Sequence, residues 1–190
     1  MIDPKKMHII AKKYEDENIA FRAFLKGHAD EDELDSQFLQ LHNELFAGYD
    51  CCKCANCCQA YAATLNESDV DAISEYIGQD KNDFIAKYLK KSEYDTSSYT
   101  IKPEPCIFLC DPGNSHYDEL SAKIAPGSLP THDGKCMIYD VRPAECKGFP
   151  FTDRPERLWH LLGVISFADV CPVVFEILQR LKKIYKFRYR

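Results

Sequence analysis

The sequence predicts a mostly helical α+β fold with few short strands and irregular cysteine-rich loops. Three observations lead to this expectation. Apolar residues recur at helical spacing near both ends, proline and glycine turns interrupt the middle, and the chain contains ten cysteines. With 190 residues, 45% of them apolar and 28% charged, the chain is long enough to bury a core and has the composition of a globular protein.

The first fifty residues are predicted to form a helical hairpin. Residues 5–26 and 31–47 carry apolar side chains at helical spacing, and the residues GHAD between them indicate a break. We therefore expect an N-terminal helical arm that covers residues 1–48.

Two more helices are expected after the first group of cysteines. Asn66 or Ser68 can cap the first of them, and Gly78 can end it. The second is expected from about Asn82 to Lys91, where apolar residues again fall on one side.

Beyond residue 94 the pattern becomes irregular. A short strand is expected before a proline-rich turn, and the polar segment 111–134 is expected to hold little regular structure. Residues 135–151 again indicate strand, turn and loop. A last helix is expected to begin near Pro172, because proline is tolerated in a first helical turn. We expect a cysteine-cluster domain over residues 49–175 and a basic C-terminal helix or tail over residues 176–190.

Charge is unevenly distributed along the chain, whose net charge is −6. Residues 1–50 contain eleven acidic and six basic side chains, whereas residues 171–190 contain one acidic and six basic side chains. A basic tail can bind nucleic acid or an anionic membrane, or it can pair with an acidic segment of its own chain. We favour pairing with the acidic arm, and do not expect a nucleic-acid partner.

The chain shows no signal for export or membrane insertion. No window approaches 18 uninterrupted apolar residues, and the first residues lack an apolar run followed by a cleavage site. We therefore expect a cytoplasmic protein without a transmembrane segment. In a reducing compartment, clustered thiols indicate metal ligands or redox centres rather than disulfides.

The strongest motif is CCKCANCC at residues 51–58, in which Cys51, Cys54, Cys57 and Cys58 form C-x2-C-x2-C-C. In a C-x2-C turn two sulfurs converge on one ion, and nearby backbone amides stabilise the thiolates. Side chains of adjacent residues diverge, so we expect Cys57 and Cys58 not to share one ion. Cys52 stands outside this spacing and is expected to be a buried apolar thiol.

Five further cysteines are scattered over the second half of the chain. Cys106, Cys136, Cys146 and Cys171 lie beside proline, glycine or turn-forming residues, where the backbone can wrap a metal. Cys110 does not, and is expected to be buried as an apolar thiol. Bacterial ferredoxins use C-x2-C-x2-C spacing and a Cys-Pro ligand to hold iron–sulfur clusters, and the pair at residues 171–172 is similar.

Two expectations concern the surroundings of these thiols. Four thiolates around one divalent zinc carry a formal charge near −2, which the guanidinium of Arg142 could offset. The alternative is that Arg142 only packs on Tyr139 or caps a turn. The core beside the thiols is expected to contain four aromatic residues: Phe108, Phe149, Phe151 and Trp159.

With these residues in view, the chain resembles the bacterial YkgJ-like cysteine-cluster family, the CxxCxxCC proteins known as a zinc- or iron-chelating domain. The matching elements are CCKCANCC, then CIFL, then GKCMIYDVRPAECKGFPF, and finally CP at residues 171–172. The resemblance implies eight metal ligands, enough for two four-sulfur sites: Cys51, Cys54, Cys57, Cys58, Cys106, Cys136, Cys146 and Cys171.

Three functions stay open from the sequence. The first is a metal-binding protein for zinc or iron, including iron held as an iron–sulfur cluster, with an undefined cellular role. The second is an iron–sulfur-dependent redox or methylase-like enzyme, since some relatives carry the cluster within flagellin lysine methylases. The third is an interaction module with the metal as scaffold and an unidentified protein partner. The expected ligand in each case is a metal ion, and the sequence does not decide whether the chain is an enzyme.

Overall fold

The structure is a computed structural model, and it divides the chain into two compact units. Unit 1 consists of Met1–Asp50 and Pro150–Arg190, and unit 2 consists of Cys51–Phe149. The residues described by the structure are 2–92, 95–102, 105–111, 113–124 and 136–189. Each unit is considered by itself below.

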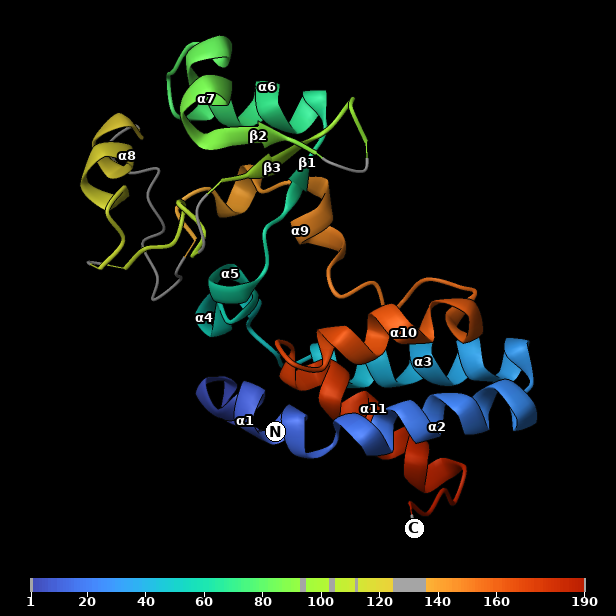
Figure 1. Cartoon of the computed structure of the whole chain (residues 1–190). Helices are drawn as coiled ribbons and strands as arrows, with labels where there is room; N and C mark the ends of the chain where they lie inside the picture. Colours follow the sequence, from blue (N-terminus) through green and yellow to red (C-terminus); the bar gives the residue numbers. More distant parts are fainter. Residues whose placement is uncertain (1, 93–94, 103–104, 112, 125–135, 190) are drawn as a thin grey trace. The chain divides into compact units, whose positions relative to one another are not determined.

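Unit 1 is helical in its described residues (Figure 1). Helix α3 follows α2 as predicted, and α10 packs against both of them while α11 packs against α3 and α10. The first predicted helix, over residues 5–26, is divided in the structure into η1, α1 and α2. The bounds of its elements are η1 Pro4–Lys6, α1 Met7–Lys13, α2 Glu15–His28, α3 Glu31–Phe46, α10 Arg157–Phe167 and α11 Pro172–Ile184.

The hairpin breaks at the position that GHAD predicts. Ala29 and Asp30 adopt extended backbone conformations between α2 and α3. The Asp30 carboxylate accepts a hydrogen bond of 3.0 Å from the Glu33 amide, which caps the first turn of α3.

Unit 1 has a hydrophobic core of its own. Helix α11 contributes a nearly continuous buried stripe because its apolar residues recur at three- and four-residue intervals. The buried apolar residues of α2, α3, α10 and α11 are Phe21, Leu25, Leu34, Phe38, Leu41, Leu45, Leu161, Val164, Ile165, Val173, Val174, Phe175, Ile177, Leu178 and Leu181.

Two cations of α11 pair with acidic residues of the N-terminal helices. Arg180 Nη1 lies 2.5 Å from Glu44 of α3, and Lys182 Nζ lies 3.0 Å from Glu17 of α2. Burial lowers the pKa of Lys182, and the Glu17 carboxylate opposes that shift. The predicted pairing of the basic C-terminal segment with the acidic arm is thus confirmed for these two side chains.

Unit 2 contains a small antiparallel sheet with helices α6 and α7 against it (Figure 1). Its strand order is β1-β3-β2, and Leu65 faces Tyr99 in the register of β1 and β3. The elements of unit 2 are α4 Cys51–Cys54, α5 Cys57–Ala60, β1 Thr64–Leu65, α6 Glu67–Tyr76, α7 Lys81–Tyr88, β2 Leu89–Lys91, β3 Tyr99–Ile101, α8 Tyr117–Lys123, η2 Tyr139–Val141 and α9 Ala144–Gly148.

The core of unit 2 lies between the sheet, its helices and the segments that carry the later cysteines. Its largest fully buried side chains include Phe84, Tyr88 and Phe108. Ile107 and Phe108 belong to this core, so the apolar residues that follow Cys106 anchor that cysteine's segment.

Helix α6 begins and ends as the sequence predicts. Asn66 forms a capping box with Asp69, in which each side chain accepts a hydrogen bond from the other residue's backbone amide. Gly78 follows the helix with a φ of +62°, a conformation that glycine adopts without steric cost.

Several local predictions were wrong. The helix expected over residues 82–91 ends at Tyr88, because Leu89–Lys91 pairs with β3 as strand β2. Segment 111–134 contains helix α8, while residues 112 and 125–134 of that segment lie outside the described residues. The described residues 136–151 contain the short helices η2 and α9 instead of a regular strand.

Helix α10 was not predicted. Its sequence RLWHLLGVISF is apolar at most positions, so it shows no clear polar face from which helical periodicity could be recognised. Trp159 on this helix is 67% exposed, so the prediction that it fills a core was wrong. Phe108 is buried as expected, and Phe149 and Phe151 are partly buried.

The predicted fold class is confirmed as mostly helical α+β with one small sheet. Within the part of the chain that the structure describes, no helix is both long enough and apolar enough to cross a membrane.

Candidate metal centre

Unit 2 contains a cavity of about 90 Å³, partly open to solvent, whose wall carries seven thiols. They come from α4, α5, the segments around residues 106 and 136, and α9, so cysteines distant in sequence meet at one place. The seven are Cys51, Cys52, Cys57, Cys58, Cys106, Cys136 and Cys146.

The C-x2-C-x2-C-C motif forms two helical turns rather than an open loop. The Ala55 amide donates to the Cys51 carbonyl oxygen at 2.9 Å, and Ala55 has a φ of +49°, so α4 ends in a left-handed residue. Helix α5 then begins at Cys57. Cys51, Cys52 and Ala55 line the cavity, and Cys54 is not part of its wall.

Cys57 and Cys58 both face the cavity, and their side chains are hydrogen-bonded to each other. The expectation that these neighbouring side chains diverge was therefore wrong. In a helical turn, adjacent residues are separated by about 100°, and both side chains of this pair border the same cavity.

Backbone hydrogen bonds hold the thiol-bearing segments together. The Cys106 amide donates to the Cys58 carbonyl oxygen at 2.7 Å, which attaches the Cys106 segment to α5. The Met137 amide donates to the Phe108 carbonyl oxygen at 2.9 Å, next to an antiparallel bridge between Leu109 and Cys136. The positions of Cys58, Cys106 and Cys136 are thus linked through the main chain.

Backbone amides donate hydrogen bonds to several sulfur atoms of the cavity. The Phe108 amide donates to Cys106, and the Ile138 amide donates to Cys136, each from two residues further along the chain. Within the motif, the Cys57 sulfur accepts hydrogen bonds from the backbone of Cys57 and Cys58. Such hydrogen bonds favour the thiolate over the thiol. Amide support is therefore present at Cys57 of the motif and at two later cysteines.

Glu145 positions the helix that carries Cys146. Its Oε1 accepts a hydrogen bond from the Tyr61 hydroxyl at 2.8 Å, and its Oε2 accepts one from the Thr64 amide. The next helical residue on its N-terminal side, Ala144, donates its amide to the Asp69 carboxylate at 3.0 Å. Helix α9 is thereby attached to β1 and α6.

Burial is the largest influence on the pKa of three of the cavity thiols, those of Cys106, Cys136 and Cys146. It raises the pKa of Cys106 to about 11 and that of Cys136 to about 12. Burial of its sulfur atom also raises the pKa of Cys146, although the residue as a whole is exposed. These three thiols are protonated at neutral pH, so a metal ion that binds them must displace their protons.

The hydrogen-bonded cysteines of α5, Cys57 and Cys58, have pKa values shifted in opposite directions. The hydrogen bond from Cys58 lowers the pKa of Cys57, and the same bond, followed by burial, raises the pKa of Cys58. Cys57 is therefore the easier of the two to convert into a thiolate, which is the form that binds metals.

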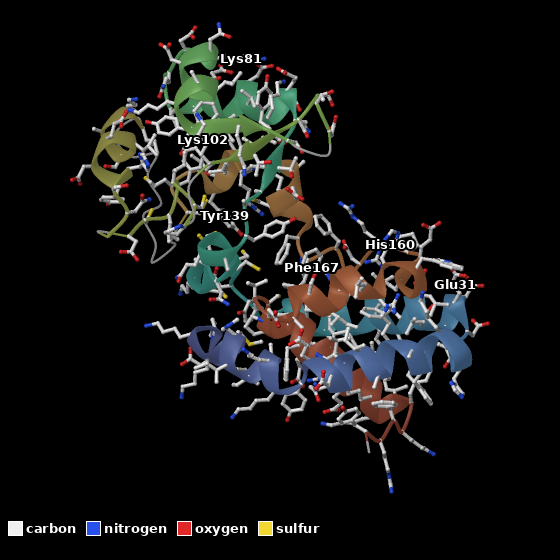
Figure 2. All side chains as sticks on the ribbon, viewed as in Figure 1. Glu31, Lys81, Lys102, Tyr139, His160 and Phe167 are labelled. Carbon is white, nitrogen blue, oxygen red and sulfur yellow. The ribbon has the colours of Figure 1, made fainter. Side chains whose placement is uncertain are left out.

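Arg142 provides the positive charge on the cavity wall. Arg142 and Tyr139 both line the cavity. Tyr139 is labelled among the side chains of unit 2 in Figure 2. A guanidinium held beside thiolates offsets their negative charge. Arg142 also packs on Tyr139, so the structure shows the contact expected from the alternative interpretation as well.

Six of the eight cysteines predicted from the sequence line the cavity, namely all except Cys54 and Cys171. Cys171 is buried at the N-terminus of α11 and belongs to unit 1. Cys52, expected only as a buried thiol, is buried and lines the cavity too. Cys110 is half-buried and is not part of the wall.

The thiols share a cavity without forming a finished coordination site. Among the residues described by the structure, no group of three or more His, Cys, Asp or Glu side chains is arranged so that it could hold a metal ion. The donor chemistry nevertheless fits the group that the sequence indicates, because thiolates are the ligands of structural zinc and of iron–sulfur clusters.

The fold and the thiol-lined cavity define a cysteine-cluster domain of the metal-chelating class. Residues 50–172 match the CxxCxxCC family, described as a putative zinc- or iron-chelating domain. The match covers more than half of the chain, and the chain belongs to this family. This membership supports metal binding. Comparisons with curated proteins and with solved structures found no significant match.

Proposed function

We propose that this chain binds zinc or iron at the thiol-lined cavity of unit 2, either as single ions or, for iron, as an iron–sulfur cluster. The observation that supports this most directly is that seven thiols from separate segments line one cavity of about 90 Å³. All-cysteine ligation suits both zinc and iron, so the donor set admits either metal.

The proposed ligands come first from the six cavity cysteines that the family pattern also contains. These are Cys51, Cys57, Cys58, Cys106, Cys136 and Cys146. Cys54 and Cys171 stay predictions that the resemblance implies. The functional domain proposed over residues 49–175 includes Cys171, and the compact units divide the chain differently.

The protein's own contribution is to hold the thiols and balance their charge. The main-chain bonds from Cys106 to Cys58 and from Met137 to Phe108 fix three thiol positions. Arg142 supplies positive charge at the wall. A bound structural metal would add folding free energy on the order of 10 kcal/mol, and the thiols would release their protons to solvent. A reducing compartment such as the cytoplasm would keep the thiols available.

Anaerobic purification followed by elemental analysis, sulfide determination and a visible absorption spectrum tests this proposal. Colourless protein with near-stoichiometric zinc indicates a zinc site. Brown protein with iron and sulfide indicates a cluster. Protein that contains neither metal, and that takes up neither when Zn²⁺ or Fe²⁺ is added without oxygen, contradicts the proposal.

A further inference from the structure

Cys52 occupies an unexpected place in the cavity wall. The C-x2-C-x2-C-C spacing leaves it out, and the sequence alone favours a buried apolar thiol at this position. In the structure its side chain is 5% exposed and borders the same cavity as six other thiols. Burial alone is ordinary for a cysteine, but Cys52 is buried beside six other thiols on one wall.

Cys52 and Cys54 differ in their relation to the cavity. Cys51, Cys52 and Ala55 form part of its wall, and Cys54 does not. Helical spacing does not decide this difference, because residues three apart lie on the same side of a helix and adjacent residues do not. The presence of Cys52 on the wall is therefore a property of the folded unit.

We infer that Cys52 is a metal ligand of this chain, in addition to the cavity cysteines that the family pattern contains. The inference rests on the proposed function, because it requires the cavity to bind metal. On binding, the Cys52 sulfur loses its proton to solvent and forms a bond to the metal, with no change in oxidation state.

Cobalt substitution distinguishes Cys52 from its neighbours, because thiolate-to-Co²⁺ absorption reports the number of bound sulfurs. The variant is Cys52→Ser, with Cys110→Ser as a matched control outside the wall. We expect Cys52→Ser to lose about one quarter of that absorption per four-thiolate ion. Cys110→Ser should keep the wild-type spectrum.

Alkylation of the wild-type protein provides a second measurement that requires no variant. Iodoacetamide labelling of Cys52, quantified by mass spectrometry relative to Cys110, should slow severalfold when Zn²⁺ is bound. This result decides the question if Cys52→Ser fails to fold, as judged by circular dichroism.

The proposed function and the inference about Cys52 are contradicted by different results. If wild-type protein binds no Co²⁺, Zn²⁺ or Fe²⁺, the proposed function and the inference both fail. If the wild type binds metal but Cys52→Ser keeps the wild-type absorption, or Cys52 labelling is unaffected by Zn²⁺, only the role of Cys52 is overturned.

Discussion

The guanidinium carbon of Arg142 lies 3.9 Å from the centroid of the Tyr139 ring, and Arg142 Nη1 donates a hydrogen bond of 2.7 Å to the Tyr139 carbonyl oxygen. These two contacts hold one cation at the wall of the thiol-lined cavity. Arginine suits this place because its charge persists at any physiological pH and its planar group stacks on an aromatic face.

Replacing Arg142 with alanine should therefore weaken metal retention while leaving helical content largely intact. Without the guanidinium, the negative charge of bound thiolates is less well balanced, and a loss of about tenfold in affinity corresponds to 1.4 kcal/mol. Competition with a chromogenic chelator measures the affinity, and circular dichroism measures the helices. Arg142→Lys keeps the charge and should retain more metal than Arg142→Ala. Equal retention by wild type and both variants would show that Arg142 is only a packing residue.

We expect Glu145 to affect metal retention only by positioning helix α9, which carries Cys146. Glu145→Ala removes the acceptor of the Tyr61 and Thr64 hydrogen bonds and frees α9, which carries Cys146. We expect a severalfold faster release of metal to a chelator. Glu145→Gln keeps one oxygen acceptor and should lie between alanine and wild type. Tyr61→Phe deletes only the hydroxyl donor and is the matched control, with a smaller effect. Release rates that do not follow this order contradict the positioning role.

Metal removal should loosen unit 2 selectively. The segments around Cys58, Cys106 and Cys136 are joined by few backbone bonds at the cavity, whereas unit 1 has its own apolar core. Hydrogen–deuterium exchange should therefore accelerate in α5, residues 106–109 and α9 when a chelator is added. Amides of α2 and α3 should change little. Uniform acceleration throughout the chain would mean that the metal supports the whole fold rather than this part of it.

Glu119 should make the free energy of unfolding depend on pH in the acidic range. Hydrogen bonds from Lys87, Lys123 and Tyr88 lower the pKa of its carboxyl to about 2, compared with 4.5 for the ordinary value. Because the folded-state pKa is the lower one, this stabilisation is present above about pH 4.5 and is lost as the pH falls toward 2. The side chain is 37% exposed, so solvent screening limits its contribution to about 1 kcal/mol.

Urea unfolding of metal-free wild type and Glu119→Gln tests this dependence. The wild type should be more stable near pH 7, and its advantage should shrink between pH 4.5 and 2. Glu75→Gln, at an exposed position of α6, is the control and should show no such change. A Glu119→Gln difference that is constant over this range would contradict the assignment.

Local signals in the sequence predicted much of the helical framework. The break before Asp30, the cap at Asn66, the stop at Gly78 and the start at Pro172 all depend on side-chain or backbone preferences within a few residues. Such preferences act wherever the segment lies in the fold, so they can be read without tertiary information. The fold class was predicted for the same reason, and the cysteine pattern identified the family.

The composition of the cavity wall required the tertiary structure. Spacing alone treats Cys51 and Cys54 as a pair, but the cavity wall of the folded unit contains Cys51 and Cys52 and not Cys54. Strand β2 was also decided by a distant partner, because only pairing with β3 converts Leu89–Lys91 from the end of a helix into a strand.

The sequence by itself determined that this chain is a helical cysteine-cluster protein, because helix signals and motif spacing are local properties. The tertiary structure decided which thiols face one another, because the direction of a side chain depends on the backbone rotation of its own turn and on contacts made by residues far away in the chain.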